Sequence, residues 1–137
     1  MSKTFKWPYR VNISDINYGG HMGNDRSLIL FHEARIAFLK SIDCSEMNIG
    51  QNLGIIMKDA HIDFLAELFH GDELEIEVKI GERKGLLFNF EYDVVRLKDQ
   101  KKVLQGRTGI LAFNYQNRKL AKAPNSFFQK IEEIYGY

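Results

Sequence analysis

Residues 24 to 40 are the segment that most restricts the fold of this chain, because they predict a helix that is apolar on nearly every side. Two apolar groups, residues 28–31 and 36–39, are separated by a few residues that include Ala34. A helix with so little polar surface is stable only when most of its circumference is buried. The rest of the chain must therefore wrap around it.

The sequence on both sides of this helix predicts strands. Residues 73 to 80 alternate between polar and apolar side chains, which indicates a strand with one solvent-exposed face and one face toward the core. Similar patterns, joined by short turns that favour antiparallel neighbours, predict strands at residues 5–13, 55–66, 86–97 and 103–115.

A last helix is predicted to open at Pro124, with Phe127, Phe128, Ile131 and Ile134 at helical spacing. A strand, a buried helix and about four antiparallel strands have few compact arrangements. We expect an α+β hotdog architecture, in which a curved antiparallel sheet of about five strands wraps around the long helix. A length of 137 residues is that of one domain, so we expect residues 1–137 to form a single unit.

The composition limits the partners and the location. The formal net charge is +1, so no long-range field favours nucleic acid or an anionic membrane. The one cysteine, Cys44, cannot form an internal disulfide or a cysteine-rich metal site, and no apolar run is long enough for a membrane span. We expect a cytoplasmic protein with no membrane insertion, no metal and no separate cofactor.

The loop before the buried helix concentrates the polar groups that suit a reactive site. Asp15, Asn17 and His21 lie among glycines that let a ligand approach the backbone. The N–H groups of Gly23 and Asn24 stand at the start of the helix, where negative charge is stabilised. We therefore predict that Gly23 contacts a ligand there and that Asn24 contributes to the chemistry.

This segment, read as Asp-x-Asn-x-x-Gly-His-x-x-Asn followed by His32-Glu33-Ala34-Arg35, resembles the acyl-CoA thioesterases of the 4-hydroxybenzoyl-CoA thioesterase type. The sequence Gly71-Asp72-Glu73-Leu74 is similar to the entry of the next strand in that family. The resemblance covers roughly residues 5 to 115. It implies hydrolysis of an acyl-CoA or acyl-carrier thioester, with CoA as part of the substrate.

The resemblance also implies an assembly. Such proteins form hotdog dimers, commonly paired into tetramers, with the thioester between one subunit's motif loop and the other subunit's strand. Arg83 and Lys84 match the basic turn that binds CoA. Alternation over residues 55 to 65 predicts that Met57 and Asp59 share a face, with His61 and Asp63, that meets the partner. The acyl chain is expected in an apolar tunnel beside Phe31, Ile55 and Met57.

One position departs from the family pattern. Asn17 stands where the family has a catalytic aspartate, and an amide can orient a water molecule but cannot accept its proton. The general base is then expected to be His21, Asp15 or Glu33, in that order, or else Asp59 or Asp63 of the partner subunit. A carboxylate on a buried helix needs a partner, and Arg35 is a local one for Glu33.

Two other functions remain open at this point. The absence of an aspartate at position 17 also fits a hotdog protein that binds acyl thioesters without hydrolysing them. A hydratase of the same fold carries Asp-x-Asn-Pro-x-His, which is similar to Asp15-Ile16-Asn17, but the proline is absent here and His21 comes one residue late.

Overall fold

The computed structural model describes residues 4–136, in which six strands form one antiparallel sheet. The strand order is β1-β3-β4-β5-β2, and the short β6 pairs with the end of β5. The strands are β1 (Phe5–Arg10), β2 (Gly54–Phe64), β3 (Glu73–Lys84), β4 (Leu87–Arg96), β5 (Lys101–Asn114) and β6 (Lys119–Ala121). The five longer strands confirm the sequence prediction, whereas β6 was not predicted.

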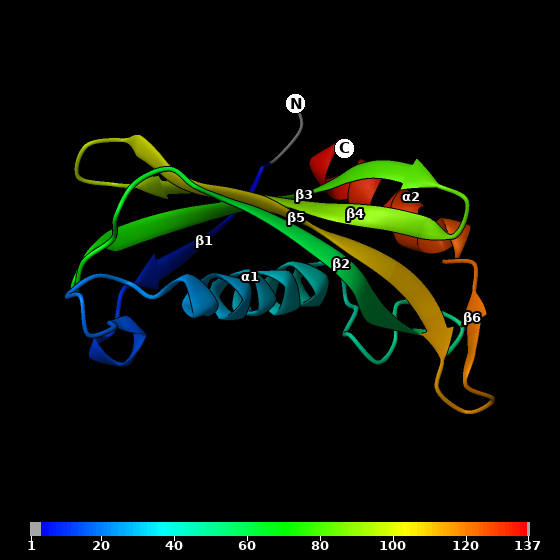
Figure 1. Ribbon diagram of the computed structural model, residues 1–137. Coiled ribbons are helices and arrows are strands. Elements are labelled where there is room, and N and C mark those ends of the chain that lie inside the picture. Colours follow the sequence, from blue (N-terminus) through cyan, green and yellow to red (C-terminus); the bar gives the residue numbers. More distant parts are fainter. Residues whose placement is uncertain (1–3, 137) are drawn as a thin grey trace.

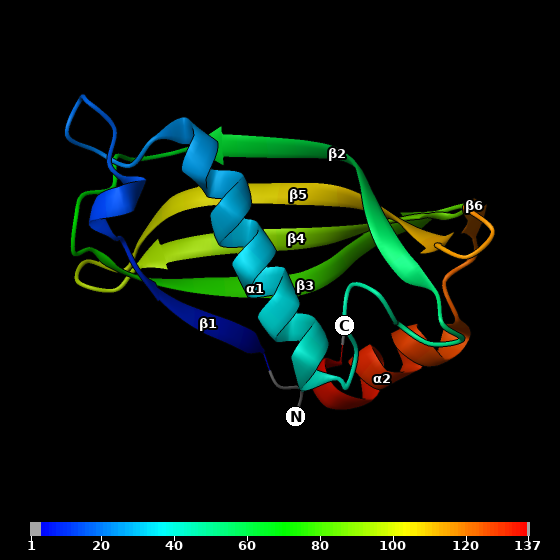
Figure 2. The same ribbon diagram turned by 90° about the horizontal axis from the view of Figure 1, so that it is seen from below.

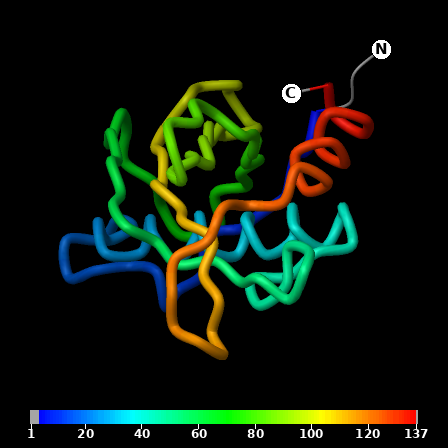
Figure 3. The backbone as a smooth tube through the Cα atoms, turned by 90° about the vertical axis from the view of Figure 1, so that its right-hand side faces the viewer, coloured from blue at the N-terminus to red at the C-terminus, as the bar shows by residue number. Residues whose placement is uncertain are grey.

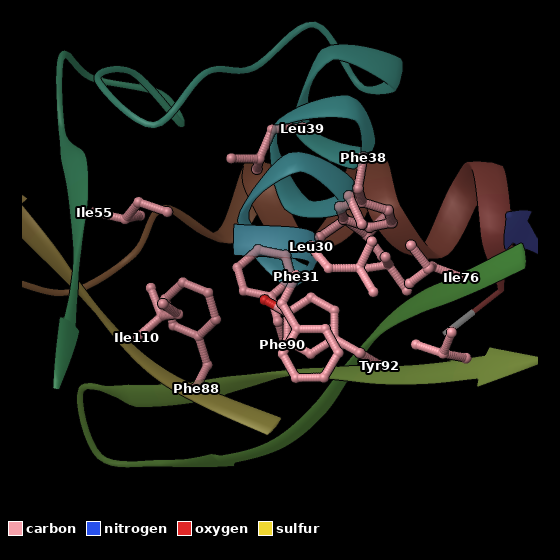
Figure 4. Close-up of a cluster of buried hydrophobic side chains, with 14 of the residues drawn as sticks. Leu30, Phe31, Phe38, Leu39, Ile55, Ile76, Phe88, Phe90, Tyr92 and Ile110 are labelled. Carbon is pink, nitrogen blue, oxygen red and sulfur yellow. The ribbon is translucent and has the colours of Figure 1, made fainter. Parts of the chain in front are cut away.

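Helix α1 (Ser27–Ser41) lies across one face of the sheet, which curves around it (Figures 1 and 2). Its buried side chains repeat at helical spacing and meet aromatic side chains from the strands (Figure 4). Phe31 stacks on Tyr92 at 4.4 Å between ring centroids, and Phe38 meets Phe90 edge to face at 5.8 Å. These contacts confirm the hotdog arrangement of a curved sheet around a helix.

The prediction that α1 is buried on most of its circumference is only partly right. Leu28, Ile29 and Ile36 remain 40 to 45% exposed on the side that faces away from the sheet. One sheet of one chain covers only one side of a helix, so the second apolar side has no cover among the described residues. The predicted burial of most of the helix circumference therefore needs a further surface.

Strand β2 corrects the predicted division of its side chains. Its pairing with β5 shifts register between Met57 and Asp59, which is the signature of a β-bulge at Lys58. Met57 is paired with the buried Ile110 and lies on the face toward α1, whereas Asp59 lies on the outer face. Met57 and Asp59 therefore do not share a face, because the bulge adds one residue and reverses the alternation.

Helix α2 (Asn125–Tyr135) packs beside the β1 edge of the sheet, at the end of α1 that is distant from the motif loop (Figure 3). Phe5 meets Tyr135 edge to face at 6.1 Å, and the Tyr135 hydroxyl hydrogen-bonds Ser41 at the end of α1. Pro124, which was predicted to open this helix, is its N-cap, and the helix begins at Asn125.

A partly buried polar network connects the middle of α1 to Glu46 and Tyr92. Arg35 donates to Glu46 at 3.0 Å and to the Tyr92 hydroxyl at 3.0 Å, and Glu46 also bonds His32. Burial opposes the charge of Glu46, but the bonds from His32 and Arg35 outweigh it and lower the pKa of that carboxyl. Glu46 is thus the partner of Arg35, not Glu33 as predicted, and Glu33 is exposed.

Candidate active site

The motif loop runs from Val11 to Arg26 and closes on itself through main-chain hydrogen bonds. The Asn17 N–H donates to the His21 carbonyl at 2.9 Å, and the Gly20 N–H donates to the Asn17 carbonyl at 3.1 Å. Gly20 has a φ of +85°, in the left-handed region that favours glycine. Tyr18 stands fully exposed at the tip. The loop is therefore a tight hairpin that fixes Asn17 and His21 relative to each other.

Asp15 anchors this hairpin and is buried, with 2% of its surface exposed. Its carboxylate accepts hydrogen bonds from the Tyr9 hydroxyl at 2.6 Å, the Asn12 N–H at 2.9 Å and Arg26 Nε at 3.1 Å. Burial alone would raise the pKa of Asp15, but these donors outweigh it and lower the pKa. A carboxylate held by three donors is a poor proton acceptor. The geometry favours a positioning role for Asp15 over the predicted role as base.

The side chains of Asn17 and His21 both lie close to Gly19. A Cβ atom on Gly19 would lie 3.2 Å from Asn17 Oδ1 and 3.4 Å from His21 Nε2. Asn17 Oδ1 accepts the Gly19 N–H at 2.9 Å, which leaves the amide NH2 group free to donate. His21 Nδ1 lies 3.2 Å from the Met22 carbonyl, which can only accept, so Nδ1 carries the proton. His21 Nε2 is then the proton-accepting atom of the neutral ring.

Only one of the two N–H groups predicted at the helix start is unpaired. The Gly23 N–H donates to the Asp15 carbonyl at 2.9 Å, so it is not available to a ligand. A 3-10 turn, Asn24–Arg26, precedes α1, and the N–H groups of Asn24 and Asp25 have no acceptor within the described chain. The main-chain N–H groups that are free to stabilise an anion are therefore those of Asn24 and Asp25, whereas Gly23 and Asn24 were predicted.

A cavity of about 210 Å³ opens beside this loop. One side is formed by the motif loop and the start of α1, through His21, Met22, Gly23, Asn24 and Ser27. The opposite side comes from the end of β2, the β2–β3 link and β5, and it is mostly apolar: Phe64, Leu65, Ala66, Glu67, Leu68 and Leu104. The cavity thus brings His21 and the free N–H donor of Asn24 against an apolar wall, which suits a carbonyl compound with an apolar substituent.

Two polar residues of this cavity, Glu67 and Ser27, were not predicted from the sequence. Glu67 is the only charged residue in the run from Phe64 to Phe69, and that isolation is a signal that could have identified it. Ser27 stands one turn before Phe31 on the buried stripe of α1, where a polar residue is out of place. Glu67 adds a carboxylate to the cavity wall and Ser27 adds a hydroxyl.

The other predicted residues lie outside this cavity. Glu33 is exposed on α1, and Asp59 and Asp63 lie on the outer face of the sheet. Phe31 and Ile55 pack in the core, so the predicted acyl tunnel is not formed beside them in one chain (Figure 4). Met57 instead borders a second cavity of about 170 Å³ with Leu28, Ile29, His32 and Arg35.

The basic turn lies at the opposite end of the sheet from the motif loop (Figures 1 and 2). The motif loop is hydrogen-bonded beside the start of β3, and Lys84 is the last residue of that strand. The twelve residues of β3 therefore separate the motif loop from the basic turn by roughly 35 Å. The Arg83 guanidinium lies 4.1 Å above the Phe128 ring and borders a cavity of about 310 Å³ with Lys122 and Asn125. One chain alone cannot bring this turn to the motif loop.

No group of three metal-binding side chains occurs within residues 4–136. No helix in the same range is long and apolar enough to cross a membrane.

Comparisons with known proteins agree with this geometry. The sequence model of the thioesterase-like superfamily matches residues 11–131. The acyl-CoA thioesterase YbgC of Haemophilus influenzae is 29% identical over 98 residues, which are 70% of this chain and 72% of that protein.

Solved structures share the fold. Slr0204 of Synechocystis, a 1,4-dihydroxy-2-naphthoyl-CoA thioesterase, superposes with a TM-score of 0.82 at 24% identity, over 94% of this chain and 96% of its own. The protein SAV2348 of Staphylococcus aureus, solved in complex with CoA, gives a TM-score of 0.86 at 19% identity, over 99% of this chain and 86% of its own.

Proposed function

The chain belongs to the thioesterase-like superfamily, and on that premise we propose that it hydrolyses the thioester bond of an acyl-CoA to a free acid and a thiol. The observation that carries the proposal is the cavity in which His21 and the free Asn24 N–H face an apolar wall. Thioester hydrolysis needs both a proton acceptor for water and donors for the carbonyl oxygen. The relatives named for acyl-CoA and naphthoyl-CoA thioesterase activity support the same substrate class.

The reaction follows from the groups in the cavity. The carbonyl oxygen of the thioester lies against the N–H group of Asn24, which stabilises the negative charge that develops on it. His21 Nε2 removes a proton from water as the water oxygen attacks the carbonyl carbon. The tetrahedral intermediate then expels the thiolate, and the imidazolium returns the proton to sulfur. The Asn17 amide NH2 group orients the water or the thioester.

The CoA portion is proposed to bind across a dimer. Strand β2 ends the sheet, and its outer edge has no partner strand within the described chain. Two such edges can pair about a two-fold axis, which also covers the exposed apolar side chains Leu28, Ile29 and Ile36 of α1. Antiparallel pairing brings the Gly54 end of one β2 beside the Phe64 end of the other.

This geometry completes the site. The β3–β4 turn lies at the Gly54 end of the sheet and the motif loop lies at the Phe64 end. In the dimer, Arg83 and Lys84 of one chain therefore approach the motif loop of the other and can meet the phosphates of CoA. The complex of SAV2348 with CoA supports this ligand class.

The decisive experiment measures thiol release from a panel of acyl-CoAs of different chain length and aromatic content. We expect turnover above background for at least one substrate class. His21→Gln should lower kcat by about a hundredfold or more, because the proton acceptor is removed. His70→Gln, which changes an exposed histidine outside the cavity, should leave kcat unchanged. No turnover by the wild type with any acyl-CoA would refute hydrolysis.

Glu67 is the rival for the role of base, since it is the other titratable residue on the cavity wall. If His21 is the base, Glu67→Gln keeps most of kcat, because the proton acceptor is still present. Loss of activity in Glu67→Gln together with retention in His21→Gln would transfer the role to the carboxylate.

A second function is favoured by Asn17, which replaces the carboxylate expected in the motif. Under this alternative the protein binds acyl-CoA and does not hydrolyse it. Calorimetric binding of an acyl-CoA without thiol release would establish the alternative, and the Asn17→Asp variant would then be expected to gain hydrolysis.

A further inference from the structure

Ser27 is the first residue of α1 and faces the interior of the protein. It is 0% exposed and lies on the same helical stripe as the buried Phe31 and Ala34. The start of α1 directly follows the motif loop (Figure 2). Ser27 is part of the wall of the cavity beside that loop. The position therefore combines a hydroxyl group, complete burial and contact with the proposed reaction site.

The hydroxyl of Ser27 has no hydrogen-bond partner within the described chain. The other buried polar side chains are satisfied: Asp15 accepts three hydrogen bonds, Arg35 donates to Glu46 and Tyr92, and Thr108 bonds the Tyr92 hydroxyl at 2.8 Å. Burying a hydroxyl without a partner costs stability, and alanine would avoid that cost at the same position. Folding alone gives no reason for this hydroxyl.

The surroundings of Ser27 indicate what its partner is. The unpaired N–H of Asn24 borders the same cavity and lies in the turn immediately before Ser27. A serine hydroxyl can turn among three staggered rotamers, so a rotation about χ1 redirects it without moving the helix. Hydroxyl and main-chain N–H donors together are a recognised way to hold an oxyanion.

We infer that Ser27 Oγ donates a hydrogen bond to the carbonyl oxygen of the bound thioester, beside the Asn24 N–H. This inference rests on the proposed function and makes Ser27 a catalytic residue of that reaction. The hydrogen bond strengthens as the oxygen gains negative charge in the transition state, so Ser27 acts mainly on kcat.

The test uses the full-length chain and the variants Ser27→Ala and Ser27→Cys. Ser27→Ala should lower kcat about tenfold or more while its melting temperature equals or exceeds that of the wild type, because an unsatisfied hydroxyl is removed. Ser27→Cys has a similar shape but a weak donor, so kcat should fall nearly as far. The matched control is Thr108→Val, which removes a buried hydroxyl that does have a partner. It should lower the melting temperature and keep kcat.

A ligand-binding measurement separates this inference from the proposed hydrolysis. The probe is an acyl-CoA analogue in which a methylene group between sulfur and the carbonyl prevents hydrolysis, and Ser27→Ala should bind it about threefold to tenfold more weakly than the wild type. Unchanged kcat and unchanged binding in an active enzyme overturn the inference and leave the proposed function standing. A lower melting temperature in Ser27→Ala also overturns it, because the hydroxyl is then structural. A wild type that neither hydrolyses acyl-CoA nor binds the analogue overturns both.

Discussion

The substitution Asp15→Asn tests whether this carboxylate anchors the motif loop. Oδ2 of Asp15 accepts the Tyr9 hydroxyl and the Asn12 N–H, and Oδ1 accepts Arg26 Nε. Asparagine has one carbonyl oxygen, which can serve the first two donors, and its NH2 group then faces the Arg26 donor. The variant keeps the shape of the side chain and loses the ion pair.

The expected loss follows from these contacts. A hydrogen bond to a charged group contributes about 1.5 to 3 kcal/mol, and the lower part of that range applies to Arg26, whose side chain is 30% exposed. The two remaining bonds become neutral and weaken by about 0.5 kcal/mol each. The free energy of unfolding should therefore fall by about 3 kcal/mol, which lowers the melting temperature of a chain of this size by roughly 10 °C.

The loss of unfolding free energy in Asp15→Asn should depend on pH. Because the pKa of Asp15 is lowered in the folded state, its stabilisation is complete above the unfolded pKa of about 4 and is lost as the pH falls through the folded value. Urea unfolding followed by circular dichroism should show the full difference from the wild type at pH 7 and a smaller difference at pH 3.

The control is Asp25→Asn in the same loop, whose exposed carboxylate should change the free energy of unfolding by less than about 0.5 kcal/mol. If Asp15→Asn unfolds like the wild type but is inactive, Asp15 is the catalytic base and its assignment as an anchor is refuted.

Three further changes test other parts of the structure. Glu46→Gln should lower the free energy of unfolding by about 3 kcal/mol in urea at pH 7, because the buried Arg35 loses its charged partner; Glu33→Gln should have no effect. Gly106→Ala should cost about 2 kcal/mol in the same assay, since the new Cβ would lie 2.6 Å from the Phe31 ring and 2.8 Å from a main-chain carbonyl. Ile29→Glu should yield a monomer in sedimentation velocity at concentrations where the wild type is a dimer; a wild type that is monomeric throughout would contradict the proposed β2 interface.

Local patterns were enough to predict the main elements. The apolar segment before Lys40 is a helix because its length and spacing allow little else, and the alternation over Glu73 to Ile80 is a strand with one buried face. The motif loop was also found from sequence, and the structure brings His21 and Asn24 to one cavity as expected.

Local sequence patterns could not predict the features that depend on which strands and side chains pair. The bulge at Lys58 adds one residue without changing the composition of β2, so alternation assigned Met57 to the wrong face. The partner of Arg35 is Glu46, eleven residues away in an irregular loop, and not the adjacent Glu33. The short β6 forms only because β5 extends beyond the end of β4 and offers a free edge at Ala112 to Asn114.

The positions of β1 and β2 at the two outer edges of the sheet have a consequence for the order of folding. Strand β1 pairs only with β3, and the long β2 pairs with β5, so neither strand made in the first half of the chain has a partner in that half. A nascent chain that ends after Phe64 holds both strands and the apolar α1 with no sheet to cover them. Synthesis must continue through β5 before the helix is enclosed, so this protein should fold late on the ribosome and benefit from a holding chaperone until then.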